Sequence, residues 1–222
     1  MCGRFSLTLD PDQLRQEFAW LNIPIDTVPR YNVAPSQPVA VVPNDGKNQI
    51  DYFVWGLIPS WSKDASIGYR MINARSETVA EKPSFRAAFR RRRCLILADG
   101  FFEWRKDAGK KSKTPYFVFL KSKKPFFFAG LWESWDSPDG SNILSCTILT
   151  TQPNDLIAPI HDRMPVILAP EYYDFWLTQN ELKPSDLQDL LKAYPSDQMS
   201  AYPVSTMVNN PANDSIECIK PI

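Results

Sequence analysis

The stretch CLILADGFFEW, residues 94–104, holds two apolar, strand-forming runs that only Asp99 and Gly100 separate. Short runs of aliphatic and aromatic residues bounded by turn residues are typical of β-strands. Similar runs follow closely, at residues 115–121, 125–133 and 143–151. Consecutive strands joined by short turns predict a mostly antiparallel sheet that curls into a barrel.

Short helices are expected to flank this sheet. Asp10 followed by Pro11 predicts a helix start with Asp10 as the cap. Residues 76–92 predict two short helical pieces broken at Pro83. Three further helices are expected at residues 153–160, 171–177 and 185–193, the last with Ser185 as its cap, and three further strands at residues 38–43, 50–56 and 164–169. The sequence therefore predicts a single α+β domain over residues 1–222.

The composition excludes several classes of protein. Hydrophobic residues make up 44% of the chain, and Lys+Arg and Asp+Glu number 25 each, so the net charge is zero. This balance argues against binding nucleic acid by bulk charge, although a local basic groove remains compatible with it. The sequence has no apolar run of about 18 residues and no signal-peptide pattern. A cytoplasmic protein is expected, nucleoid-associated if bacterial, with no membrane partner.

The cysteines and the single histidine argue against a metal site. The four cysteines match no zinc-binding spacing, and His161 is the only histidine, which excludes a site of several histidines. Cys94 and Cys146 lie inside strand-like runs and are predicted to be buried free thiols. Disulfides are not expected in a cytosolic chain.

The first residues of the chain have an unusual reactivity. Met1 precedes the small residue Cys2, so removal of Met1 is expected to leave an N-terminal cysteine. Its α-amine would have a pKa of about 7.7–8.0, and its thiol is strongly nucleophilic once ionised. Such an amine and thiol condense with an aldehyde to form a five-membered thiazolidine. In most chains, however, a cysteine at this position merely follows the start codon.

Three other polar residues allow both a structural and a chemical interpretation. Glu103 lies between Phe102 and Trp104, and strand alternation predicts that it faces water, whereas burial would make it a general acid or base. Asn73 at a strand-to-helix junction is typical of a cap or turn residue. His161 is either a structural loop residue or a proton-transfer group.

Basic and aromatic residues suggest contacts with nucleic acid. Four consecutive arginines at 90–93 form either a solvated face or a phosphate-binding patch. Trp61 lies in a polar turn, where an aromatic ring beside arginines could stack on a base, whereas Trp55 suits a core equally well.

Six ordered motifs resemble one family, the SRAP proteins, which process abasic sites in bacteria and eukaryotes. The motifs are MCGRF at 1–5, RYNVAPSQ at 30–37, WGLIPSW at 55–61, INAR at 72–75, ADGFFEW at 98–104 and IHDRMPVIL at 160–168. They span most of the chain, and PVS at 203–205 fits as well.

The resemblance implies a covalent DNA–protein crosslink at abasic sites in single-stranded DNA. Cys2 matches the nucleophile of the family, whose amine attacks C1′ of the ring-opened sugar while its thiol closes a thiazolidine. Asn73 would orient the amine and the sugar, and Glu103 would transfer protons. His161 would assist opening of the sugar ring.

The resemblance also implies DNA contacts for four residues. Arg4, Arg75 and Arg163 match positions that hold phosphates, and Trp61 would stack or wedge at a neighbouring base. It further implies a monomer without a cofactor, whose partner is single-stranded DNA with an abasic site. DNA lyase activity and self-processing peptidase activity belong to the same set of expectations.

The sequence leaves two other functions open. An N-terminal-nucleophile hydrolase would use Cys2 against an amide, with its own amine as the base. A non-covalent single-strand binder would leave Cys2 without a role and would depend on phosphate contacts.

Overall fold

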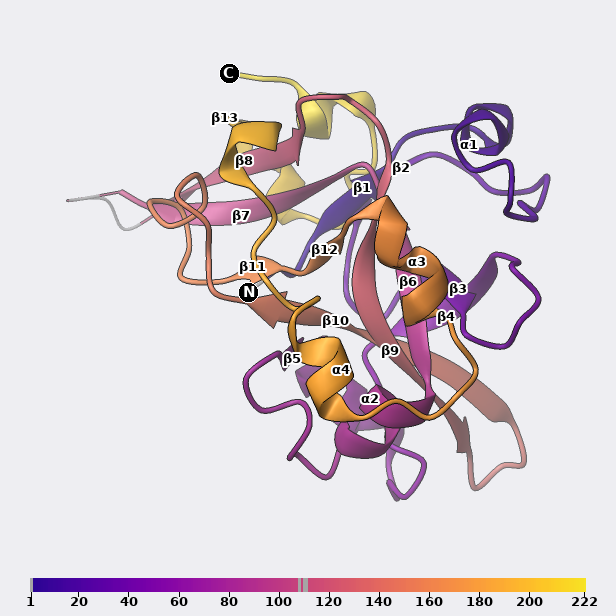
Figure 1. Ribbon diagram of the computed structural model, residues 1–222. Helices are drawn as coiled ribbons and strands as arrows, with labels where there is room; N and C mark the ends of the chain where they lie inside the picture. Colours follow the sequence, from indigo (N-terminus) through magenta and orange to yellow (C-terminus); the bar gives the residue numbers. More distant parts are fainter. Residues whose placement is uncertain (1, 108, 110–111) are drawn as a thin grey trace.

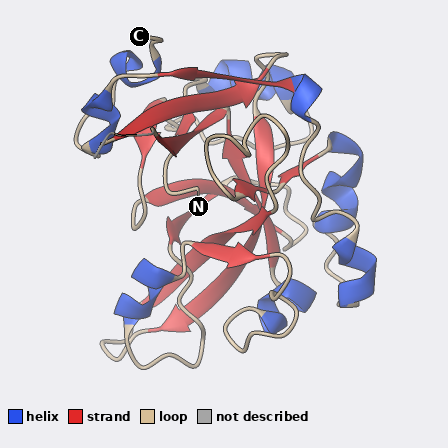
Figure 2. Cartoon of the chain, turned by 90° about the vertical axis from the view of Figure 1, so that its left-hand side faces the viewer, coloured by secondary structure: helices blue, strands red, loops and turns tan. Residues whose placement is uncertain are grey.

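Two β-sheets make up the molecule (Figures 1 and 2). The computed structural model describes residues 2–107, 109 and 112–222, so Met1, whose removal is expected, lies outside the described residues. The first sheet has the spatial strand order β13–β8–β7–β1–β2. Its strands are β1 (Phe5–Leu7), β2 (Arg30–Val33), β7 (Gly100–Lys106), β8 (Lys113–Leu120) and β13 (Met199–Pro203).

The second sheet closes into a five-stranded barrel. The order β10–β4–β3–β6–β9 returns to its start because β9 also pairs with β10. The barrel strands are β3 (Pro38–Pro43), β4 (Asp51–Trp55), β6 (Arg93–Ala98), β9 (Phe126–Asp136) and β10 (Asn142–Thr151). Three short strands extend it, β5 (Asn73–Arg75), β11 (Met164–Pro165) and β12 (Ile167–Leu168). Among the pairings of the described strands, only those of β10 with β4 and β5 are parallel. The predicted mostly antiparallel, barrel-like α+β fold is therefore confirmed.

The chain changes sheets between β6 and β7, in the middle of the stretch 94–104. β6 pairs with β3 and β9, whereas β7 pairs with β1 and β8. Asp99 forms the corner, where it accepts hydrogen bonds from Ser6 Oγ (2.5 Å) and from the Thr8 backbone N–H (2.6 Å). The corner is fixed by these contacts with β1 and the residues that follow it, and it divides the predicted strands between two sheets.

Both faces of β6 are buried. Alternate residues such as Leu95 and Leu97 pack with the helices in one apolar cluster. Their neighbours Cys94, Ile96 and Ala98 pack with Cys2 and the first sheet in a second cluster. Strands covered on both faces show continuous apolar runs, as here, rather than alternation. The free thiols of Cys94 and Cys146 are buried, as predicted.

The helices are short and lie around the barrel. They are α1 (Pro11–Glu17), α2 (Arg86–Arg91), α3 (Tyr173–Trp176) and α4 (Pro184–Gln188), with the 3₁₀ segments η1 (Ala65–Arg70), η2 (Pro170–Tyr172), η3 (Ser196–Gln198), η4 (Thr206–Asn209) and η5 (Ile216–Ile219). Asp10 caps α1 by accepting from the Gln13 backbone N–H, as predicted. The helix near residue 185 instead begins at Pro184, with Lys183 as its cap.

Two segments expected to be helical form turns. Residues 76–85 contain turns, so only the second of the two pieces predicted before residue 92 is a helix, α2. Residues 155–160 likewise form turns, and the strand expected at 164–169 is split into β11 and β12. None of the described helices combines the length and apolar character needed to cross a membrane.

Candidate functional site

Cys2 is fully buried just before β1, and Asn73 holds its backbone. The Asn73 side chain donates from Nδ2 to the Cys2 carbonyl oxygen at 2.8 Å. Asn73 begins β5, opposite Ile148 of β10, so it is a strand residue and not the cap or turn residue that its position suggested. Its Oδ1 is buried without a hydrogen-bond partner among the described residues. An acceptor therefore remains available next to Cys2.

Glu103 lies on β7 and is only 1% exposed. The prediction that alternation turns it to water was wrong, because both faces of β7 are covered. Phe101, two residues away on the same face, packs in the cluster that contains Cys2, and Phe102 packs in a third cluster with the C-terminal residues. Burial raises the pKa of the Glu103 carboxyl to about 7. Near neutral pH, both its protonated and its ionised forms are therefore present.

His161 faces Glu103 from the turn that follows β10. Its Nε2 lies 3.9 Å from Glu103 Oε2, and its Nδ1 accepts a hydrogen bond from the Arg163 backbone N–H at 3.1 Å. Burial lowers the pKa of His161, which favours the neutral imidazole at pH 7. Nδ1 also lies 2.8 Å from Asp162 Oδ1, a contact that becomes an ion pair when the ring is protonated.

Four predicted site residues thus meet around the N-terminal segment. Burial and then the nearby Glu103 charge raise the pKa of the Cys2 thiol, which connects Cys2 electrostatically to Glu103. The arrangement places a neutral thiol, a carboxyl group that titrates near pH 7, a neutral imidazole and an amide within one small region. Such a set can move protons between a bound carbonyl compound and a nucleophile.

Arg4 points into the protein. Its NH1 donates to Asn32 Oδ1 at 2.7 Å and to the Val208 carbonyl oxygen at 2.6 Å, and the residue is 9% exposed. Its guanidinium also lies 6.0 Å from the ring centroid of Trp104. Arg4 therefore links the strand after Cys2 to the C-terminal part of the chain, a partnership that the sequence did not indicate beyond the presence of Asn32 in the RYNVAPSQ motif.

The Arg163 side chain also binds groups of the protein itself, whereas the Arg75 side chain is open to solvent. Arg163 forms a two-pronged ion pair with Glu77, at 2.5 and 2.9 Å, and donates to the Thr150 carbonyl oxygen at 2.6 Å. Arg75 is exposed on β5. Glu77 was not predicted as a partner, and its only signal in the sequence is its place two residues after the INAR motif.

Trp61 is 59% exposed at the tip of a fixed turn. The Ser62 N–H donates to the Pro59 carbonyl oxygen at 2.8 Å, and Trp135 Nε1 donates to the Ser62 carbonyl oxygen at 2.7 Å. The ring is therefore presented to solvent on a restrained loop. Trp55, in contrast, is fully buried.

The four consecutive arginines do not form one basic patch. Arg93 is fully buried, and Arg92 forms an ion pair with Glu133. Arg90 and Arg91 both face Glu181, at 4.0 and 3.0 Å. The run therefore does not present all four arginines on one surface. Within the part of the chain that the structure describes, no group of three or more His, Cys, Asp or Glu side chains could hold a metal ion.

Comparisons with known proteins agree with the motifs and the fold. The family model described as SOS response associated peptidase (SRAP) matches residues 1–211. The chain is 48% identical to the abasic site processing protein YoqW of Bacillus subtilis over 99% of both chains, and 30% identical to the abasic site processing protein HMCES of Rattus norvegicus over 100% of this chain and 76% of that protein. A crystal structure of a protein from Bacteroides thetaiotaomicron matches with a TM-score of 0.89 at 25% identity, over 100% of both chains. The chain therefore belongs to the SRAP family.

Proposed function

We propose that this protein processes abasic sites in single-stranded DNA by forming a covalent crosslink through Cys2. The observation that carries the proposal is the position of Cys2, held by Asn73 and beside the Glu103–His161 pair. The names of the curated relatives, which are abasic site processing proteins, support the same substrate. A base lost from DNA leaves a sugar that opens to an aldehyde, the partner that an N-terminal cysteine requires.

The first step is attack of the Cys2 amine on C1′ after removal of Met1. Addition gives a carbinolamine, and the protonated Glu103 carboxyl donates the proton with which the hydroxyl leaves as water. The pKa of Glu103, near 7, suits this role because the carboxyl is protonated in part of the molecules at neutral pH. The product is an iminium between the Cys2 nitrogen and C1′.

The second step is closure of the ring by the thiol. Burial raises the pKa of the Cys2 thiol, so sulfur stays protonated until the iminium forms. Sulfur then bonds to C1′ and its proton passes to the Glu103 carboxylate, which returns to its starting form. One water leaves and one thiazolidine forms. Closure removes the iminium that would otherwise acidify C2′ and cut the strand by β-elimination.

Asn73 and His161 prepare the reactants. Asn73 fixes the Cys2 backbone through its Nδ2 and offers its Oδ1 to the amine or to a sugar hydroxyl. His161, whose Nε2 faces Glu103, transfers a proton as the sugar ring opens. Because its pKa is lowered, His161 can accept a proton only transiently at neutral pH.

The DNA strand is proposed to run past Arg75 and Trp61. Arg75 is exposed and can reach a phosphate, and the exposed Trp61 ring can stack on a base. For Arg4 and Arg163, a phosphate contact would compete with the bonds that each makes inside the protein. We therefore propose that Arg75 and Trp61 contribute more to direct DNA binding than Arg4 and Arg163 do. The protein is proposed to act as a monomer.

A denaturing gel tests the proposal. The protein lacking Met1 is mixed with a labelled single-stranded oligonucleotide that carries one abasic site, and the parent is expected to give a band that survives denaturant and salt. Cys2→Ala keeps an α-amine but lacks the thiol, so it is expected to lose the stable band and to give a labile imine or a cut strand.

Two results would contradict the proposal. A Cys2→Ala crosslink as stable as that of the parent would exclude the thiazolidine. If the parent gives no band although mass spectrometry confirms the free N-terminal cysteine, the covalent function is wrong and an N-terminal-nucleophile hydrolase becomes the better hypothesis.

A further inference from the structure

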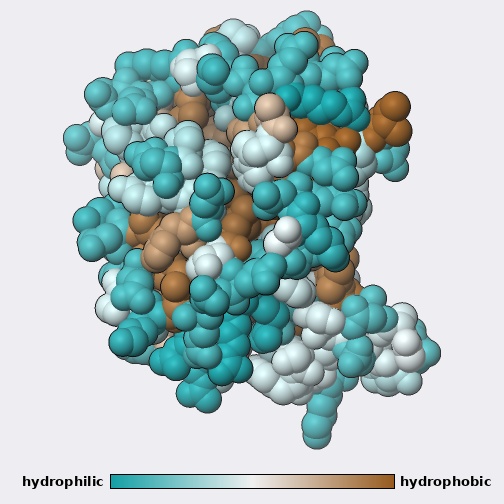
Figure 3. Space-filling view, turned by 45° about the vertical axis from the view of Figure 1, so that its right-hand side comes forward, coloured by the Kyte–Doolittle hydropathy of each residue, from teal (hydrophilic) through white to brown (hydrophobic). Residues whose placement is uncertain are grey.

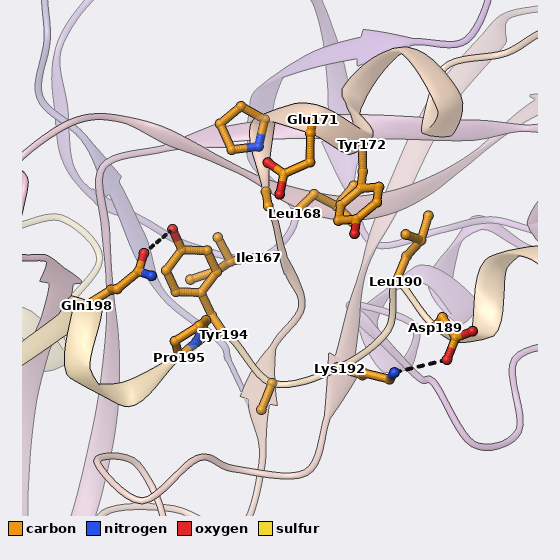
Figure 4. Close-up of a pocket in the computed structure, with 13 residues that line it drawn as sticks. Ile167, Leu168, Glu171, Tyr172, Asp189, Leu190, Lys192, Tyr194, Pro195 and Gln198 are labelled. Atoms are coloured by element: carbon orange, nitrogen blue, oxygen red, sulfur yellow. Dashed lines mark hydrogen bonds and ion pairs between the residues drawn. The ribbon is translucent and has the colours of Figure 1, made fainter.

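A cavity of about 570 Å³ lies between the β12–η2 segment and the residues that follow α4 (Figure 4). Its lining does not include Cys2, Glu103 or His161. Ile167 and Leu168 give it an apolar wall, and Tyr172 and Tyr194 face it from different segments. A cavity with this lining suits a ligand that has both apolar and polar parts.

One carboxylate in this cavity lacks a counter-ion. Lys192 Nζ pairs with Asp189 Oδ1 at 2.9 Å, whereas Glu171 forms no ion pair with the described residues. Figure 4 shows the Glu171 carboxylate facing the same space as the two tyrosine rings. Burial and then the Glu171 charge raise the pKa of Tyr194, which also indicates that the two side chains are close. Two tyrosine rings and a carboxylate are the chemistry that binds a lysine or arginine side chain.

Two further cavities adjoin the first one. Tyr194 and Gln198 also line a cavity of about 300 Å³, and Pro170 also lines one of about 440 Å³ that contains Trp20. The three cavities together are lined by more carboxylates than lysines, namely Glu17, Glu171, Asp174, Asp189 and Asp197 against Lys121, Lys124 and Lys192. The excess negative charge repels a DNA backbone and attracts a basic chain.

We propose that these three cavities form a basic-peptide groove, which binds an extended segment of a partner protein. A lysine or arginine of that segment enters between Tyr172 and Tyr194 and pairs with Glu171, while its aliphatic stem packs on the apolar wall. Proline or aliphatic residues of the segment fill the adjoining cavities, where Trp20 is 38% exposed. On the side of the molecule that carries α1 and α3, apolar patches interrupt the hydrophilic surface (Figure 3).

Fluorescence anisotropy tests the groove with the full chain and without DNA. The probes are labelled nine-residue peptides in which lysine or arginine alternates with proline or leucine, and matched peptides with glutamate at every basic position. We expect the basic peptides to bind and the acidic ones not to bind. Glu171→Lys and Tyr194→Ala should each weaken binding about tenfold, whereas Tyr194→Phe keeps the ring and should retain most of the affinity.

Matched controls separate the groove from bulk charge. Asp12→Lys makes the same charge change at an exposed position of α1 that lines none of the three cavities, so it should weaken binding less than about twofold. Equal losses for Glu171→Lys and Asp12→Lys would overturn the proposal. Displacement of the peptide by an equal concentration of spermidine would overturn it too, since a free amine would then be the ligand. Because the assay contains no DNA, its failure leaves the crosslinking proposal untouched.

Discussion

At the scale of single residues, burial governs the ionisation of Glu103. Its folded-state pKa of about 7 exceeds its ordinary value of 4.5, so the folded protein holds this proton more tightly than the unfolded chain does. The associated stability is fully present below pH 4.5 and is lost as the pH rises through about 7. Ionised Glu103 therefore destabilises the fold under mildly alkaline conditions.

Glu103→Gln should consequently change stability in a pH-dependent way. The amide has nearly the same shape but no charge, so the variant should match the parent at pH 4 and exceed it at pH 8 by about 1–3 kcal/mol. Urea unfolding at the two pH values measures this difference. A parent that is the more stable protein at pH 8 would mean that an interaction of the ionised carboxylate outweighs its burial.

The same carboxyl should shape the pH dependence of crosslinking. The proposed chemistry needs protonated Glu103 and a neutral α-amine, whose pKa values are about 7 and about 7.7–8.0, so the rate should be highest between about pH 7 and pH 8. Glu103→Gln should be slower by about 10²-fold or more and should lose the alkaline limb that Glu103 causes. Quenched time courses on abasic single-stranded DNA from pH 5.5 to 9 provide the profile. An unchanged alkaline limb in the variant would assign that titration to another group.

At the scale of elements, Arg93 joins α2 and α3 to the barrel. The residue is fully buried and donates to the carbonyl oxygens of Trp176 at 3.0 Å and Thr178 at 2.6 Å, and it also donates to the Arg90 carbonyl oxygen. These carbonyls lie at or near the ends of short helices, where the backbone lacks partners of its own. Burial lowers the pKa of Arg93 to about 10, so it remains charged at neutral pH.

Arg93→Met should destabilise the protein by about 3–5 kcal/mol, because several buried carbonyl groups lose their donor at once. Arg91→Met is the matched control, since the Arg91 side chain is 64% exposed and pairs with Glu181 on the surface. It should cost less than about 0.5 kcal/mol. Urea midpoints of the two variants test the difference, and similar midpoints would show that the carbonyls of α2 and α3 find other partners.

Strands were more predictable than helices because apolar runs are local signals. The sequence predicted the runs that form β6 to β10. Residues 76–85 and 155–160, which were predicted to be helical, form turns instead. One of these turns is closed by a hydrogen bond from the Thr78 backbone N–H to the Arg75 carbonyl oxygen at 3.1 Å. The Asn154 side chain accepts from the Ile157 backbone N–H at 3.0 Å, as the cap of a helix does, but residues 155–160 remain turns. The change of sheet at Asp99 is invisible in the sequence because both flanking runs are equally apolar.

The predictability of the candidate site has a similar limit. The resemblance identified Cys2 and Asn73 as a pair, and their contact of 2.8 Å is consistent with it. The alternation of residues along the strand predicted that Glu103 faces water and that Phe102 faces the core. Both faces of β7 are covered instead, because residues more than 100 positions later in the chain pack on the Phe102 face. The partners of Arg4 and Arg163 depend equally on tertiary contacts that no local pattern contains.

At the scale of the whole molecule, the C-terminal residues hold the segment that carries Cys2. Asp214 accepts from the backbone N–H groups of Tyr31 and Asn32 at 2.6 and 2.9 Å, and from Arg30 Nε. Asn32 in turn donates to the carbonyl oxygens of residues 208, 210 and 213 and accepts from Arg4. This series of hydrogen bonds connects Asp214 through Asn32 to Arg4, which lies two residues from Cys2.

Asp214→Ala should therefore affect both stability and crosslinking. It leaves three donors of β2 without their acceptor, which should cost about 1–2 kcal/mol, and it should slow crosslinking because Arg4 and the strand after Cys2 lose support. Affinity for undamaged single-stranded DNA should stay near that of the parent, since neither Arg75 nor Trp61 contacts this region. Glu217→Ala is the control, because that carboxylate is 53% exposed and forms an ion pair with Lys220 on the surface. If Asp214→Ala lowers the urea midpoint while the crosslinking rate stays at the parent value, the C-terminal residues stabilise the fold without positioning Cys2.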